Sequence, residues 1–236
     1  MCIHYLRRLT STNRSSHSNS HIGFVLSFIA GATNAGAFLA VGIYTSHMTG
    51  VVSSLADNLV LGQITLSLAA IGAVLSFLGG AITSTVMIHY AKRRTLSSLF
   101  ALPLMLEALL LLIFGLLGSH LAKIQGFLYI PATVMLLCFM MGLQNAVITK
   151  ISGALVRTTH LTGTITDLGI ELGKLIYWNR RPQAANQKVQ ADFGRIKLFT
   201  QLLSAFFIGG LCGALGFKYA GYITTVPLAA VLVVIA

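Results

Sequence analysis

The sequence predicts an all-α membrane protein with six transmembrane helices and two short re-entrant or interfacial helices, arranged as a three-plus-three inverted repeat. Three observations lead to this fold class: the composition, the length of the apolar stretches, and an internal duplication. Apolar residues make up 56% of the chain and charged residues 9%, whereas a soluble domain carries about 25% charged residues. Long apolar runs separated by short basic segments are typical of a multipass membrane protein.

Six apolar stretches are long enough to cross a bilayer, which requires about 20 apolar residues. They cover residues 22–43, 64–90, 97–119, 127–149, 197–217 and 219–236. Two shorter segments, 51–62 and 164–177, are compatible with helices but are too short to span. We expect each of them to be either a half-helix that enters the membrane and stops, or a helix that lies at the interface.

The basic residues orient the spans. If the N-terminus is cytoplasmic, only Lys123 and Lys218 of the 16 Lys and Arg residues fall outside. Because positive residues favour the cytoplasmic side, both termini are expected there. Residues 1–21 are polar and basic, and are predicted to be a disordered tail. Residues 178–196 are predicted to be a solvated cytoplasmic loop.

The formal net charge of +11 is a feature that nucleic-acid-binding proteins share. Here the basic residues lie at the ends of apolar segments, where they explain topology, so nucleic acid is excluded as a partner. The three cysteines form no CxxC pair. Neither a disulfide framework nor a metal site is therefore expected, and no cofactor.

An internal duplication relates the two halves of the chain. Matching segments occur in the same order: "FIAGATNA" (28–35) with "FMMGLQNA" (139–146), "HMTG" (47–50) with "HLTG" (160–163), "FLGG" (77–80) with "FIGG" (207–210), and Pro-Leu at 103–104 with 227–228. The first membrane repeat is assigned to residues 22–119 and the second to 120–236. Each copy holds three spans, and an odd number inverts the second copy relative to the first.

Two longer segments carry a family resemblance. "AGATNAGAFLAVGIYTSHMTGVVSSLADNLVLG" (30–62) and "GLQNAVITKISGALVRTTHLTGTITDLGIELG" (142–173) resemble the signature of the YoaK family. These are bacterial multipass membrane proteins without an established function. The resemblance covers nearly the whole chain after residue 21. It implies location in the bacterial inner membrane and implies no activity.

The repeated His-x-Thr-Gly motif is the main candidate site. Thr and Gly before a helix are typical of a helix start, and Ser54–Asp57 and Thr164–Asp167 have capping-box spacing. A helix start directed into a cavity, beside an imidazole that titrates near neutral pH, suits a small anion or a proton relay. The alternative is that the motifs are only capped turns.

Other polar residues within the apolar segments extend this site. Glu107 lies in mid-span, where an ionisable group costs about 2.5–3.5 kcal/mol and usually faces protein or water. It is interpreted either as a proton-coupling carboxyl or as a protonated hydrogen-bond donor to a neighbouring helix. Asn34 and Asn145 occupy equivalent depths and bind substrate or hold helices together. The predicted substrate path comprises His47, Thr49, Gly50, His160, Thr162, Gly163, Asn34, Asn145, Asp57, Asp167 and Arg157, with Glu107 for proton coupling.

Two further patterns are interpreted as structural. Asp167, Glu171 and Lys174 form one polar stripe, which predicts an amphipathic helix with an intrahelical Glu–Lys pair. Small residues recur every four positions in the second and fifth spans and predict close helix packing. They are Gly72, Ser76, Gly80 and Ser84, and Ala205, Gly209 and Gly213.

These patterns favour a secondary transporter or channel for a small solute, either anionic or proton-coupled. No catalytic residues and no enzymatic activity are expected. Two alternatives stay open: an intramembrane enzyme acting on a lipid-type substrate, and a non-catalytic membrane partner or assembly protein. The expected partners are the lipid bilayer, a small molecule or ion, and a second copy of the chain in a homo-oligomer.

Overall fold

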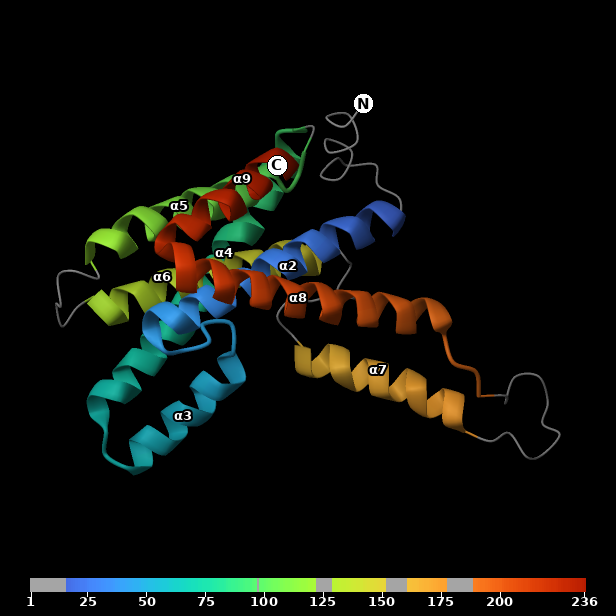
Figure 1. Ribbon diagram of the computed structural model, residues 1–236, viewed down its shortest axis with the longest axis horizontal. Coiled ribbons are helices and arrows are strands. Elements are labelled where there is room, and N and C mark those ends of the chain that lie inside the picture. The colour runs from blue at the N-terminus through green and yellow to red at the C-terminus, as the bar shows by residue number, and fades with distance from the viewer. Residues whose placement is uncertain (1–15, 97, 122–128, 152–160, 178–188) are drawn as a thin grey trace.

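The computed structural model describes residues 16–96, 98–121, 129–151, 161–177 and 189–236 (Figure 1). These residues form helices joined by short turns, so the predicted all-α class is confirmed. The elements are α2 (Ser16–Val41), α3 (Met48–Val60), α4 (Ile64–Arg93), α5 (Ala101–Leu121), α6 (Tyr129–Ile151), α7 (Leu161–Ile176), α8 (Phe193–Ala220), the 3-10 helix η2 (Gly221–Thr224) and α9 (Thr225–Ile235).

Four helical segments of the described chain are long and apolar enough to cross a membrane: His21–Val41, Ile64–Arg93, Pro131–Ile151 and Phe193–Ile235. The last of these contains α8 and α9, separated by the turn at Gly221, whose φ of +63° favours glycine. The apolar stretch of α5, Ala101–Leu116, is shorter. The protein is therefore a helical membrane protein with four candidate spans and a shorter apolar helix.

Large apolar side chains are exposed along α4 and α8. Hydrocarbon rather than water suits such a surface, because a soluble monomer rarely exposes a contiguous apolar face of this length. The exposed side chains are Leu68, Leu75, Leu78, Ile82 and Val86 on α4, and Phe207, Ile208, Leu211 and Leu215 on α8.

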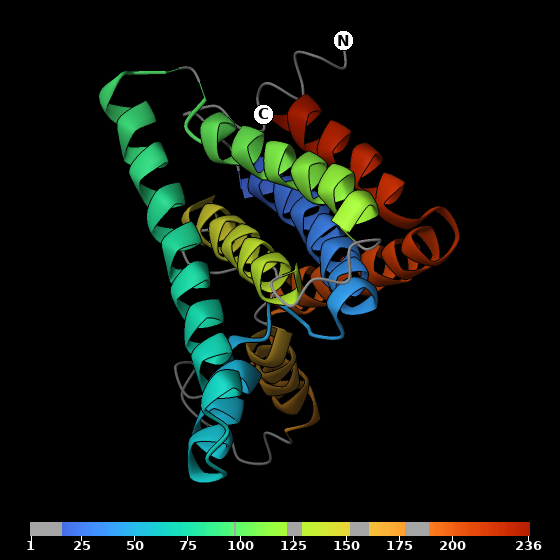
Figure 2. The same cartoon turned by 90° about the vertical axis from the view of Figure 1, so that its left-hand side faces the viewer.

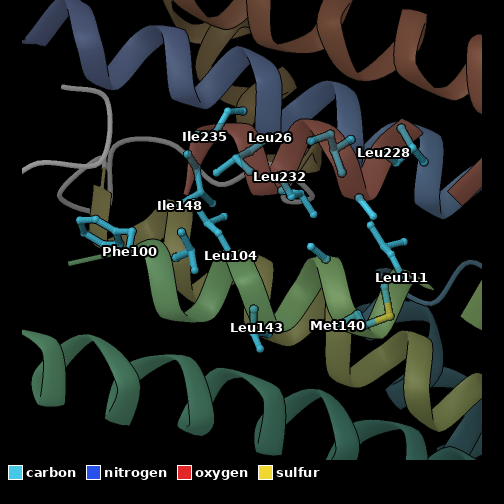
Figure 3. Packing of buried hydrophobic residues seen from close by; sticks show 14 of the residues in the cluster. Leu26, Phe100, Leu104, Leu111, Met140, Leu143, Ile148, Leu228, Leu232 and Ile235 are labelled. Carbon is cyan, nitrogen blue, oxygen red and sulfur yellow. The ribbon is translucent and has the colours of Figure 1, made fainter. Parts of the chain in front are cut away.

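The buried core lies between α2, α5, α6 and α9 (Figure 3). Leu26, Leu104, Met140 and Leu232 come one from each of these helices and are fully buried. In Figures 1 and 2, α5 and α9 lie side by side over this core. The longest helix, α4, runs along one edge of the molecule (Figure 2).

Glycines bring α4 and α6 into backbone contact. A Cβ at Gly80 would meet the carbonyl oxygen of Phe139, and a Cβ at Gly142 would meet that of Phe77. Only glycine fits at two such positions, so the small residues of α4 form a packing surface as predicted.

The helices α2 and α8 approach in the same way. A Cβ at Gly209 would meet the carbonyl oxygen of Phe28, and one at Gly31 would meet that of Phe206. The sequence alignment paired Phe77 with Phe207. In the structure, the contact of Phe77 with Gly142 corresponds to that of Phe206 with Gly31. The two crossings therefore correspond with a shift of one residue, which brings the two small-residue series into register.

Two predicted boundaries differ from the structure. The helix α2 begins at Ser16, so residues 16–21 are helical rather than part of a disordered tail, and residues 1–15 lie outside the described part. The helix α8 begins at Phe193, inside the predicted loop 178–196, of which 178–188 is not described. Its start is fixed by Asp192, whose carboxylate accepts hydrogen bonds from the backbone N–H of Gly194 and Arg195.

Candidate functional site

The first His-x-Thr-Gly motif forms the start of α3. His47 directly precedes the helix and makes no side-chain cap bond, while Thr49 and Gly50 lie in the first turn. The predicted capping box is wrong, because Ser54 and Asp57 lie inside α3. The same holds for the second copy, where α7 begins at Leu161, ahead of Thr164.

The glycine of the motif is required by the histidine. A Cβ at Gly50 would lie 2.5 Å from Nδ1 and 2.7 Å from Cε1 of His47. Any side chain at this position would displace the imidazole. The motif is therefore a unit in which glycine makes room for the ring.

Asn34 holds the loop before this unit. Its Oδ1 accepts hydrogen bonds from Ser46 Oγ (2.9 Å) and from the Ser46 backbone N–H (3.4 Å). The Asn34 side chain is largely buried in α2. Asn34 thus positions the residue next to His47.

A cavity of about 580 Å³, the polar cavity, lies beside His47. Residues from the first turn of α3 and the first turn of α7 both line it, together with α4 and α6. The lining consists of Ser46, His47, Met48, Thr49, Phe77, Ala81, Thr85, Gly142, Asn145, Ala146, Thr149, Lys150 and Thr162. The structure therefore brings together His47, Thr49, Asn145 and Thr162 from the predicted site.

A second cavity of about 550 Å³, the apolar cavity, is also lined by His47. Its lining is mainly apolar and comes from the 42–47 loop, α3, α4 and α6. The residues are Gly42, Ile43, Tyr44, His47, Gly50, Val51, Ser54, Asn58, Thr65, Leu66, Ala69, Ala70, Ala73, Pro131, Val134, Met135 and Cys138. His47 is the residue that both linings share.

The two cavities follow one another along the paired helices α4 and α6. On α4 the lining runs from Thr65 to Thr85, and on α6 from Pro131 to Lys150. At 1.5 Å per residue these stretches are each about 30 Å long. The hydrocarbon core of a bilayer has about the same thickness.

Several predicted site residues lie elsewhere. Asp57 and Asp167 are exposed on α3 and α7 and line neither cavity. Gly163 lies in the first turn of α7 but is not part of either lining. Arg157 and His160 lie outside the described residues.

Glu107 is fully buried on α5, away from both cavities. Within the described part of the chain, neither of its carboxyl oxygens has a hydrogen-bond partner. Burying a charged carboxylate without a partner is costly, so a neutral, protonated group suits this position.

Among the lining residues that sequence reasoning missed are three with polar side chains on α4 and α6: Thr85, Thr149 and Lys150. Lys150 served only to orient the spans, and the two threonines were not singled out. The usable signal was their helical spacing from recognised positions. Thr149 lies four residues after Asn145, and Thr85 lies eight residues after Phe77 of the repeated FLGG segment, whereas Lys150 has no such spacing from a recognised position.

Of the polar stripe of α7, Glu171 faces the protein. Glu171 is buried and accepts a hydrogen bond from the Asp192 backbone N–H (2.9 Å), which links α7 to the start of α8. Lys174 Nζ donates to Glu171 at 2.8 Å, which confirms the predicted pair. The Asp192 amide first, and then Lys174, lower the pKa of Glu171 below its ordinary value.

Among the described residues, no group of three or more His, Cys, Asp or Glu side chains is placed to hold a metal ion. The polar cavity has one histidine, one lysine and several hydroxyl groups in its described lining. Such groups bind and orient a solute through hydrogen bonds and charge.

The fold and the exposed apolar helices define an integral membrane protein of helical type. The chain belongs to the family described as protein of unknown function (DUF1275), whose model matches residues 22–236. It is 27% identical to the UPF0700 transmembrane protein YoaK of Bacillus subtilis (strain 168) over 161 residues, which are 66% of this chain and 68% of that protein. The resemblance to the YoaK family is thereby confirmed. No solved structure matches the chain.

Proposed function

We propose that the protein is a secondary transporter or channel for a small solute, whose path follows α4 and α6 and passes His47. The observation that carries this proposal is the pair of cavities that follow one another along α4 and α6 and are both lined by His47, over a length close to the hydrocarbon thickness. A non-catalytic partner protein has no need of such cavities.

An inverted repeat supports the proposal. The pairing of α2 with α8 corresponds to that of α6 with α4, and the pairing of α3 with α4 corresponds to that of α7 with α8. Glycine-to-backbone contacts occur at equivalent positions of both crossings. Transporters with inverted repeats bind their solutes near the midplane, between the repeats.

Re-entrant geometry of the two short helices also fits. The first turns of α3 and α7 line the same cavity, and in Figure 1 the two helices diverge from the middle of the molecule. Interrupted helices that begin at the midplane are typical of transporter sites. In this arrangement six segments cross the bacterial inner membrane, α5 and α9 among them, and both termini are cytoplasmic.

An enzymatic role receives less support. The described lining of the polar cavity contains no Asp, Glu or Cys side chain. The described lining of the apolar cavity, which His47 shares, contains no Asp or Glu either. Acid–base chemistry on a lipid therefore lacks a carboxyl partner for His47 in the described lining of both cavities. We propose a non-enzymatic protein.

The test is a permeability assay on proteoliposomes, which records light scattering after osmotic shock with a panel of small neutral, anionic and cationic solutes. The wild type should speed the entry of at least one solute. Ala146→Phe, which fills the polar cavity, should abolish this effect. Ala132→Phe is the matched control, because Ala132 is exposed on the same helix and lines neither cavity. Equal behaviour of both variants and the wild type would contradict the proposed path.

A further inference from the structure

We propose that the polar cavity binds a small oxyanion with a single negative charge, and that Lys150 supplies the opposing charge. The inference rests on the proposed function, because it names the class of solute that the path carries. It assigns to Lys150 a binding role that its place at the end of α6 does not require.

The charged side chains in the described lining of the polar cavity are of positive sign only. Lys150 is the permanently charged residue of the described lining, and no described carboxylate lines the cavity or pairs with this lysine. A cavity with apolar walls and one cation concentrates anions. One ammonium group balances one negative charge, which selects a monovalent anion.

Hydrogen-bond donors accompany the lysine. The hydroxyl groups of Thr49 and Thr162 belong to α3 and α7, so donors reach the cavity from two elements. The Thr85 hydroxyl of α4 also lines the cavity, but it donates its hydrogen to the carbonyl oxygen of Ala81 (2.9 Å). The helix starts of α3 and α7 add partial positive charge. Oxyanion oxygens accept charge-assisted hydrogen bonds from such groups. The adjoining apolar wall at Phe77 and Ala81 suits a short hydrocarbon remainder, as in a small carboxylate.

The internal repeat allows each lining residue to be compared with its counterpart in the other half of the chain. The comparison shows which polar residues the helix packing requires. Asn34 corresponds to Asn145, and Phe206 corresponds to Phe77 through its contact. Counting from these pairs, three polar lining residues have apolar counterparts: Thr85 with Ala214, Thr149 with Phe38, and Lys150 with Leu39. In place of a polar wall, Phe38 stacks on Tyr44 with ring centroids 4.5 Å apart. The helix crossing therefore forms without these polar groups. Because the proposed repeat is inverted, topology accounts for a basic residue at position 150 but not at position 39, so Thr85 and Thr149 are the part of this difference that points to a ligand.

Three probes of similar size test the charge requirement. Isothermal titration calorimetry of the purified full-length protein with propionate, propionamide and propylammonium compares an anion, a neutral amide and a cation. Propionate should bind and the other two should not. Nitrate, in a fourth titration, separates carboxylates from inorganic oxyanions. Binding of nitrate alone would assign an inorganic oxyanion and would still support the proposal.

Variants at one position test the role of the lysine. Lys150→Gln should weaken propionate or nitrate binding about tenfold or more, which corresponds to about 1.4 kcal/mol. Lys150→Arg should restore most of the affinity. Lys92→Gln should leave it unchanged, because Lys92 occupies the last turn of the neighbouring helix α4 and does not line the cavity.

The failures of the two proposals are distinguishable. If propionamide or propylammonium binds as well as propionate, or if Lys150→Gln binds anions like the wild type, the anion site is wrong. The path itself stays supported if Ala146→Phe still blocks permeation. If no anion binds and none permeates, the anion site is overturned, whatever the neutral solutes do.

Discussion

In the first His-x-Thr-Gly motif, the histidine ring is the group that the other residues accommodate. His47 is common to both cavities, and the space above Gly50 is what the imidazole occupies. The backbone does not need glycine there, because position 50 lies in the first turn of a regular helix. The glycine is present for the histidine, and this coupling lets the role of the ring be tested without removing it.

Gly50→Ala should displace the His47 ring and slow permeation through the path. The gain in helix propensity offsets part of the steric cost, so the free energy of unfolding should change by less than about 1 kcal/mol. Gly169→Ala is the control, because a Cβ there meets nothing within 4 Å. It should stabilise α7 by about 0.5–1 kcal/mol and leave permeation unchanged. Normal permeation in Gly50→Ala would show that the ring position is unimportant.

The sequence identified residues of this site better than it identified their roles. His47, Thr49, Asn145 and Thr162 were found because they recur in matching context or interrupt an apolar run. Lys150 was missed, since a basic residue at the end of a span is already explained by topology. Which side chains line a common cavity depends on the packing of α3 and α7 against α4 and α6, and a linear pattern contains no such information.

At the scale of helices, two adjacent glycines differ in what they contact: one allows the partner backbone to approach closely, and the other does not. In α4, a Cβ at Gly80 would enter the backbone of α6, whereas one at Gly79 would make an ordinary 3.8 Å contact. In α8, Gly209 and Gly210 differ in the same way. The sequence predicted small-residue packing from spacing, but it did not settle which glycine of each pair faces the partner, and the alignment of the two pairs was wrong by one residue.

Gly80→Ala and Gly209→Ala should each lose about 1–3 kcal/mol of stability, as overpacked core positions do. Gly79→Ala and Gly210→Ala should be neutral or slightly stabilising, because helix interiors favour alanine. The measurement is the unfolding midpoint of each variant in one detergent. If all four variants behaved alike, the crossing geometry would be incorrect.

The attachment of α7 depends on a carboxylate that sequence reasoning treated as a surface charge. Glu171 is buried and bound to the Asp192 amide and to Lys174. The sequence predicted the polar stripe of α7 but not the direction in which Glu171 faces. In a soluble protein the apolar face of an amphipathic helix is buried and the polar face is exposed. Where lipid surrounds the helix, the apolar face is exposed instead. The apolar side chains Leu172 and Ile176 are accordingly exposed.

This attachment should weaken in acid. The pKa of Glu171 is lowered on folding, so its contribution is present above the ordinary pKa of Glu and is lost as pH falls through the lowered value. The protection of the α7 amides, measured as hydrogen exchange relative to the intrinsic rate at each pH, should fall below about pH 4, the range where free Glu titrates. Glu171→Gln should exchange faster than the wild type at neutral pH and should lose this acid-dependent change. Asp167→Asn, on the exposed side of α7, should behave like the wild type.

For the whole molecule, the proposed inverted repeat requires that the two short helices leave the cavity toward opposite membrane surfaces. The turn after α3 and the segment before α8 should then lie on opposite sides. Composition, apolar length and charge bias were sufficient to predict a multipass helical protein. The number of crossings was less predictable, because α9 covers only 11 residues and α8 and α9 form one continuous apolar segment.

Cysteine labelling in intact cells tests this arrangement. In a variant whose native cysteines are replaced by alanine, Gln63→Cys lies between α3 and α4, and Gln190→Cys lies between α7 and α8; both positions are exposed. A membrane-impermeant maleimide should label Gln63→Cys in intact cells, and Gln190→Cys only after the membrane is opened. Labelling of both positions from the same side would exclude the inverted repeat. The two helix starts would then approach the cavity from one surface, and a closed pocket rather than a path across the membrane would be the consequence.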